Sequence, residues 1–173
     1  MTYVRKMILC GLVCSFASLP AKASNTDAVV SESATINAPV LDVWEAMKTI
    51  RKNDPAHRRV LSSGGGDYVV EEKFENIPVL GDATCTYKEH EIPMQKVQYS
   101  MIKSDKLKAF EGEWELSPSA DGKQTTVKLS SRTDAGMRIL FAERITRSRT
   151  AKSIAIRLAE VSEIASRPRV ASK

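Results

Sequence analysis

Residues 33–50 read SATINAPVLDVWEAMKTI, and this stretch decides the fold of the chain. Its first residues continue a weak alternation that begins near Val29, which is typical of a β-strand with one buried face. Ala38-Pro39 follows, and proline fits the first turn of a helix because that turn leaves its N–H groups unpaired anyway. The next residues repeat apolar side chains at helical spacing: Val40, Val43, Trp44 and Met47. A strand therefore leads at once into an amphipathic helix with an early tryptophan.

The first 23 residues have the pattern of a secretory signal peptide. Residues 5–6 are basic, residues 7–19 form an apolar run, and Ala21-Lys22-Ala23 presents small residues where a signal peptidase reads them. We expect cleavage after Ala23 and export of the protein to the periplasm or out of the cell. An uncleaved membrane anchor is the alternative, but the apolar run is shorter than the ~20 residues that span a bilayer.

Removal of residues 1–23 from the 173-residue chain leaves 150 residues, a length that suits one domain. That segment holds Arg5, Lys6 and Lys22 and no acidic residue, so the net charge falls from +5 to +2. Such a small positive surplus is poor evidence for binding to nucleic acid. No nucleic-acid partner is expected.

Of the three cysteines, Cys10 and Cys14 lie in the signal peptide and Cys85 remains alone, so no disulfide forms within the mature chain. Cys85 stands in an alternating segment beside Tyr87, and we expect a small buried core residue rather than a reactive thiol. A lipid attached to Cys14 would make the protein a lipoprotein. The preceding Val13 disfavours this alternative because lipid attachment favours a small residue there.

Six segments after the first helix alternate in the manner of β-strands separated by turns. Asp54-Pro55 ends the helix, and residues 64–67 (GGGD) and Asp121-Gly122 are turn signals. Residues 137 to about 166 hold no proline or glycine and form a long helix, followed by a flexible tail at 167–173. The order predicts an α+β fold with six to seven strands in a curved antiparallel sheet, one face of which is covered by the last helix. The six segments are 57–62, 68–74, 83–92, 97–102, 110–116 and 125–132.

The last helix carries two apolar stripes, rotated by roughly 100° from each other. A kink, a bend or a local register shift is expected in the polar stretch 146–150 between them. Arg144 and Arg147 lie close to the point where the stripes would merge. Residues 138–157 hold six basic residues and one acid, which indicates either a solvated face or attraction to an anionic membrane surface.

No pattern of catalytic or metal-binding residues is present. His57 and His90 are the only histidines, and the sequence lacks HExxH, paired CxxC and a phosphate-binding glycine loop. We interpret the acidic residues of the strands as solvated faces, because carboxylates at alternate positions line one side of a strand. These are Glu71, Glu72, Glu75, Glu111, Glu113 and Glu115. The sequence therefore predicts no catalytic residue, no metal and no cofactor.

The aromatic side chains of the expected strands share the parity of the apolar residues. Packing in a core explains each of them alone. Where a strongly curved sheet grips a helix, however, inward side chains line a pocket, and tyrosine hydroxyls supply its polar groups. The set is Tyr68, Phe74, Tyr87, Tyr99, Phe110 and Trp114.

The order of elements, with Ala38-Pro39 and Trp44, resembles the START-like (SRPBCC, helix-grip) superfamily over residues 24–166. Residues 110–118 (FEGEWELSP), with Asp121-Gly122 and the following Thr-Thr-Val, resemble the penultimate hairpin of its polyketide cyclase and coenzyme-Q-binding branches. The resemblance implies a helix-grip domain that often encloses an apolar cavity. Members bind lipids, sterols, quinones or polyketides, and some catalyse cyclisation or dehydration. They share no universal catalytic residue.

The leading hypothesis is an exported binder or carrier of a hydrophobic small molecule or lipid, held between the sheet and the C-terminal helix. One alternative is a polyketide cyclase/dehydratase-like enzyme, which needs polar residues that converge in the pocket. The other is an interaction module of the cell envelope with no ligand. The sequence indicates no oligomeric state. The expected ligand-binding residues are Tyr87, Tyr99, Met101, Trp114, Phe141, Arg144, Ile145 and Arg147.

Overall fold

The computed structural model describes residues 29–52, 54, 56–77, 80–136 and 142–167. The predicted signal peptide lies outside these residues, as does the predicted tail beyond Arg167. The described elements are β1 (Val30–Ile36), α1 (Val40–Lys52), β2 (Arg58–Gly64), β3 (Asp67–Ile77), β4 (Gly81–Ile92), β5 (Lys96–Ser104), β6 (Ala109–Pro118), β7 (Thr125–Asp134) and α2 (Ala142–Ala165).

The described strands form one seven-stranded antiparallel sheet in the order β1-β7-β6-β5-β4-β3-β2. From β2 to β7 each strand lies beside its neighbour in the chain, as hairpin connections require. The first strand departs from this order and pairs with the last, with Val30 opposite Ser131 and Ile36 opposite Thr125. The predicted α+β fold, with a curved sheet and a long C-terminal helix, is confirmed.

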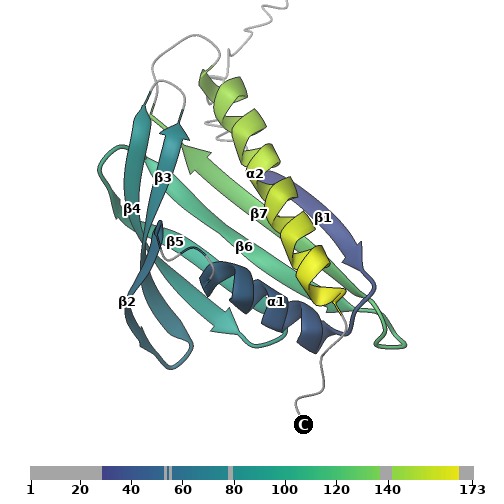
Figure 1. The fold of residues 1–173 in the computed structure, drawn as a ribbon. Coiled ribbons are helices and arrows are strands. Elements are labelled where there is room, and N and C mark those ends of the chain that lie inside the picture. Colours follow the sequence, from purple (N-terminus) through teal and green to yellow (C-terminus); the bar gives the residue numbers. More distant parts are fainter. Residues whose placement is uncertain (1–28, 53, 55, 78–79, 137–141, 168–173) are drawn as a thin grey trace, which may run out of the picture.

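Helix α2 crosses one face of the curved sheet, and α1 lies beside the C-terminal half of α2 (Figure 1). Helix α2 packs against β1, β7 and α1. It runs through residues 146–150 as uninterrupted α-helix, so the local register shift that was one of the expected forms is not present, while the expected kink or bend stays a prediction. None of the described helices is long and apolar enough to cross a membrane.

Two apolar clusters divide the space under the sheet. The first joins α1, α2, β1 and β5 to β7, and Trp44 of the opening helix is buried in it. The second covers the inner faces of β3, β4 and β6 and contains no described residue of α2. Helix α2 thus covers the β1–β7 side of the sheet and stands away from β3 and β4. This arrangement leaves room between the helix and the second cluster.

Cys85 belongs to the second cluster and is fully buried. Burial, with a smaller effect of the Glu72 carboxylate, raises the pKa of its thiol to about 12. The thiol is therefore protonated at neutral pH, and reactivity requires the thiolate. The prediction of a buried, free cysteine is confirmed.

Candidate functional site

A cavity of about 950 Å³ lies between α2 and the inner face of the sheet. Its sheet side comes from β2 to β7, and its helix side from residues 145–167 with Ile50 and Arg51 of α1. The volume is near the upper end of the roughly 300–1,000 Å³ typical of small-molecule pockets. The apolar part of its lining consists of Ile50, Phe74, Ile77, Tyr87, Tyr99, Leu107, Phe110, Trp114, Leu129, Ala135, Ile145, Ile154, Ile156 and Ile164.

Four aromatic rings form a continuous wall on the sheet side of the cavity. Phe110 lies at its centre, with ring centroids 5.1 Å from Phe74, 5.2 Å from Tyr87 and 4.9 Å from Tyr99. The Phe74 and Tyr87 rings meet Phe110 edge to face, which is a favourable arrangement of aromatic quadrupoles. The strands of an antiparallel sheet hold these rings in place, so the wall is formed before any ligand enters.

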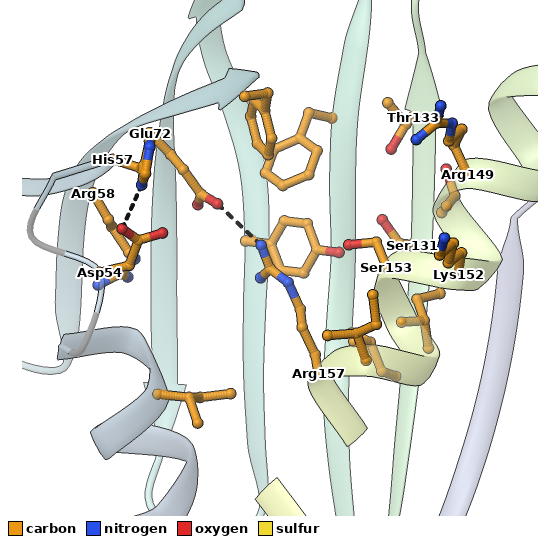
Figure 2. Close-up of a pocket in the computed structure, with 18 of the residues that line it drawn as sticks. Asp54, His57, Arg58, Glu72, Ser131, Thr133, Arg149, Lys152, Ser153 and Arg157 are labelled. Atoms are coloured by element: carbon orange, nitrogen blue, oxygen red, sulfur yellow. Dashed lines mark hydrogen bonds and ion pairs between the residues drawn. The ribbon is translucent and has the colours of Figure 1, made fainter. Parts of the chain in front are cut away.

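A group of paired charges, here called the inner cluster, lies beside this wall and consists of Arg58, Glu72, Tyr87, Glu89 and Arg157. The Tyr87 hydroxyl donates a hydrogen bond to Glu72 Oε2 at 2.5 Å, and the Arg157 guanidinium donates to Glu72 Oε1 at 3.0 Å. Figure 2 shows Arg157 reaching from α2 towards Glu72 on β3. Arg58 donates to Glu89 Oε2 at 2.8 Å and approaches the Tyr87 hydroxyl at 3.4 Å.

The pairing within the inner cluster sets its protonation. Burial, with help from Glu72, raises the pKa of Tyr87, so its hydroxyl keeps its proton. Burial disfavours the charged form of Arg157 and of Arg58, but the neighbouring carboxylates outweigh it and raise the pKa of both. The cluster therefore pairs two charged guanidinium groups with Glu72 and Glu89 and holds a neutral phenol.

Arg51 extends this network towards α1. Its side chain is 14% exposed, and it pairs with Glu91 and lies 4.0 Å from Glu89. Its Nε and Nη1 atoms are buried without a hydrogen-bond partner among the described residues. Burial therefore lowers the pKa of Arg51, although Glu89 opposes this effect. Leaving buried donors unpaired costs free energy, so Glu89 and Glu91 are needed to hold this arginine.

The edge of the cavity near the end of α1 carries a third group, formed by Asp54, His57 and Glu75. The His57 Nδ1 atom lies 2.5 Å from Asp54 Oδ1, and its Nε2 atom lies 3.4 Å from Glu75. The hydrogen bond with Asp54, followed by its charge, raises the pKa of His57. All three side chains are more than a third exposed, so solvent reaches the contacts of His57 with Asp54 and Glu75.

The described residues contain no group of three His, Cys, Asp or Glu side chains that could hold a metal ion. The polar side chains of the inner cluster form hydrogen bonds and ion pairs with one another. The site thus offers a preformed aromatic wall, hydroxyl groups and guanidinium groups, with no described metal ligands.

The sequence matches the family model described as polyketide cyclase / dehydrase and lipid transport over residues 27–163. The chain belongs to this family. The match covers most of the chain and confirms the resemblance to the START-like superfamily. A search of curated proteins found no match.

Solved structures of the superfamily share the fold of this family member. The Zhui aromatase/cyclase from Streptomyces sp. R1128 matches with a TM-score of 0.69 and 18% identity, over 84% of this chain and 99% of that one. A protein from Thermus thermophilus matches with a TM-score of 0.67 and 15% identity, over 80% and 97% of the two chains. A START superfamily protein from Mycobacterium smegmatis matches with a TM-score of 0.58 and 9% identity, over 78% and 97%. At these identities the likeness shows the fold alone.

Four of the eight residues expected to bind ligand line the cavity of this family member: Tyr87, Tyr99, Trp114 and Ile145. Met101 packs against the second apolar cluster and does not line the cavity. Arg144 and Arg147 are exposed and lie outside the lining. Phe141 lies outside the described residues. Ligand binding by the four lining residues stays a prediction, and no contact with the cavity supports it for Met101, Arg144 or Arg147.

The sequence interpretation missed the inner cluster. Glu72 was assigned to a solvated face, yet its side chain is only 12% exposed and contacts Arg157. The alternation of β3 does indicate an inward side chain, because Glu72 lies between the inward residues Val70 and Phe74. The same parity places Glu89 with Tyr87 on the inner face of β4, where Glu89 is 5% exposed. The solvated-face interpretation of Glu72 is therefore wrong.

Proposed function

We propose that this protein binds or carries a hydrophobic small molecule or lipid in the cavity between the sheet and α2. The cavity of about 950 Å³ with its preformed aromatic wall carries the proposal. Each Å² of apolar ligand surface removed from water contributes about 25 cal/mol. A ligand that covers the four rings would therefore bind without a cofactor. The same cavity weighs against an interaction module with a filled core.

Native mass spectrometry and solvent extraction of the protein purified from its own compartment test this proposal. The expected result is a co-purifying apolar molecule that is released on extraction. Thr133→Trp places a large ring in the cavity, since Thr133 of β7 lines it. Lys128→Trp adds the same ring on the outer, exposed face of that strand and serves as the control. Loss of ligand in the first variant alone supports the proposal. A protein that carries and accepts no lipid or other apolar compound contradicts it.

A second candidate is a polyketide cyclase- or dehydratase-like enzyme, favoured by the convergence of Glu72, Tyr87 and Arg157. Arg157 and Arg58 are placed to stabilise negative charge on a carbonyl oxygen, as preorganised donors do in enzymes. The Glu72 carboxylate is placed to accept a proton from a substrate bound in the same cavity. The family description names both polyketide cyclase / dehydrase and lipid transport, which supports either candidate.

Turnover of a poly-β-ketone model substrate separates the two candidates. An enzyme would convert it, and Tyr87→Phe would lower the rate while ligand binding is retained. A carrier would bind such a compound and release it unchanged. The absence of any conversion by wild-type protein that demonstrably binds the substrate would remove the enzyme candidate.

We further propose that residues 1–23 direct export and are removed, so that the protein works in the periplasm or outside the cell. The basic start, the apolar run and Ala21-Lys22-Ala23 support this assignment. An exported carrier would meet its ligand at or beyond the cell membrane.

A further inference from the structure

A second polar region lies on the other side of the cavity from Glu72. It is formed by Arg149, Lys152 and Ser153 of α2 with Ser131 and Thr133 of β7, and all five line the cavity. Figure 2 shows these side chains on the side of α2 and β7, with Arg157 between them and Glu72. We call this region the cation rim.

The cation rim differs from the inner cluster in its charge balance. Arg149 and Lys152 are exposed and form no ion pair with a described carboxylate. The inner cluster, by contrast, balances each arginine with a glutamate. Within the described part of the chain, the rim therefore presents two positive charges to the cavity without an ion-pair partner.

The geometry of the helix lets both cations reach one group. Arg149 and Lys152 are three residues apart, which places their Cβ atoms about 5–6 Å from each other on one helix surface. Ser131 and Thr133, two residues apart on β7, point to the same side of the sheet. Two cations and the hydroxyl groups of Thr133 and Ser153 thus surround one part of the cavity. This set matches the needs of a carboxylate or phosphate.

The acidic side chains at the cavity lie elsewhere. Glu160 follows Lys152 by eight residues, which is about 12 Å along the helix axis. Glu163 pairs with Arg167 further on. Asp54 and Glu75 stand at the edge near α1 and contact His57. An anion bound at the rim would therefore lie closer to Arg149 and Lys152 than to these acidic side chains.

We propose that the cavity takes an anionic amphiphile in one orientation, with its acidic group on Arg149 and Lys152 and its apolar part against the aromatic wall. This inference rests on the binding function proposed above and names its ligand class. The opposite orientation would place the acid beside Glu72 and Glu89. Their guanidinium partners already pair with these carboxylates, and separating a partly buried pair without replacement costs free energy.

Fluorescence titration with dansyl-aminoundecanoic acid and its methyl ester tests the inference, because the two probes differ in charge and share their apolar part. The wild-type protein should bind the acid about tenfold more tightly, which corresponds to two partly exposed ionic contacts. Arg149→Gln with Lys152→Gln should remove this preference and leave ester binding unchanged. Arg144→Gln with Arg147→Gln makes the same change of charge on the same helix, outside the cavity lining, and should keep the preference. Added salt should weaken acid binding in the wild type alone.

A second arm distinguishes the source of the acidic group. It measures uptake of a fluorescent phosphatidic acid from phosphatidylcholine vesicles against uptake of a fluorescent phosphatidylcholine. A preference for the acid in either arm, lost with the rim variant and kept with the control variant, supports the inference and identifies the class as fatty acid or acidic phospholipid. Equal binding of acid and neutral probe in both arms overturns it and leaves the proposed binding function intact. Equal loss of preference in both double variants overturns it too, because bulk helix charge then explains the effect. Binding of no probe at all would overturn the binding function and the inference together.

Discussion

At the scale of single residues, the position of Tyr99 depends on a missing side chain. Gly112 lies opposite Tyr99 on β6, and a Cβ atom built there would lie 2.4 Å from the Tyr99 hydroxyl oxygen and 2.2 Å from the backbone oxygen of Ser130. The glycine therefore makes room for the ring, in the manner of an aromatic side chain covering a strand glycine. Burial raises the pKa of the Tyr99 hydroxyl there, and the neighbouring Ser131 hydroxyl opposes this effect.

Gly112→Ala should destabilise the protein by about 1–3 kcal/mol, because the added methyl group clashes with backbone that cannot move freely. Urea unfolding measures this change, and near-UV circular dichroism reports the displaced Tyr99 ring. Gly64→Ala is the matched control, since nothing lies within 4 Å of its added Cβ atom and its φ is not in the left-handed region. Equal stability of the two variants would show that β6 and β7 yield more easily than the contact distances imply.

His57 gives a prediction on pH dependence. Its pKa is raised by Asp54, so it should titrate above its usual value of about 6.5. Asp54→Asn should lower the His57 pKa in an NMR titration, whereas Asp67→Asn should leave it unchanged because Asp67 contacts His90 instead. A group with a raised folded-state pKa stabilises the fold at pH values below its unfolded pKa, and this contribution is lost as the pH rises through the raised value. Wild type and His57→Gln should thus differ in stability at acidic pH and converge at alkaline pH. A His57 pKa that does not respond to Asp54→Asn contradicts the assigned contact.

The sequence predicted which aromatic side chains point inward but did not predict the pairing of Glu72 with Arg157. Strand parity correctly placed Tyr87, Tyr99 and Trp114 on the inner face, because alternation depends on local geometry alone. It gave the same orientation for Glu72, but a carboxylate is stable there only with a partner. That partner, Arg157, stands 85 residues further along the chain. Pairing over such a separation follows from the packing of α2 on the sheet, which no local pattern encodes.

At the scale of elements, Glu89 joins three of them. It lies on β4 and contacts Arg58 of β2 and Arg51 of α1, and its side chain is 7% exposed. Through these contacts the edge of the sheet and the end of α1 are held together. The carboxylate is therefore more than a local feature of β4.

Glu89→Gln should lower the free energy of unfolding by about 3–5 kcal/mol, because it leaves two buried guanidinium groups without their shared anion. Glu111→Gln removes a carboxylate that is 49% exposed and pairs with Arg132, and it should cost less than about 1 kcal/mol. Chemical denaturation of both variants provides the comparison. A similar small effect in both would mean that Arg51 and Arg58 find other acceptors.

Helix α2 shows where periodicity stops being informative. The sequence interpretation placed Arg147 near the ligand because this residue lies close to the point where the two apolar stripes would merge. The core that packs on this helix begins near Ala151, and Arg147 is exposed. Arg157 lies inside the packed half of α2 and reaches the cavity instead. The sequence predicts the helix and its apolar stripe, while the length of helix that the sheet covers depends on the tertiary fold.

At the scale of the whole molecule, the proposed export predicts a definite mature chain. Expression of the full 173-residue sequence in a bacterial host should give a periplasmic protein that begins at Ser24 and has 150 residues. Intact-mass measurement of the fractionated protein checks this. Ala23→Arg should block cleavage and leave the longer chain, because the peptidase requires a small residue there. Full-length wild-type protein in the cytosol would contradict the proposed export.

The pairing of β1 with β7 has a consequence for the timing of folding. Ser31 and Ser130 face each other across this pair although 99 residues separate them in the chain. During synthesis β1 is made first, yet its partner strand is made after every other strand of the sheet. Contacts of such long sequence separation form late, because their loop-closure entropy must be overcome first. If the chain crosses a membrane as an extended thread, as the proposed export implies, its sheet cannot be completed until the last strand has emerged.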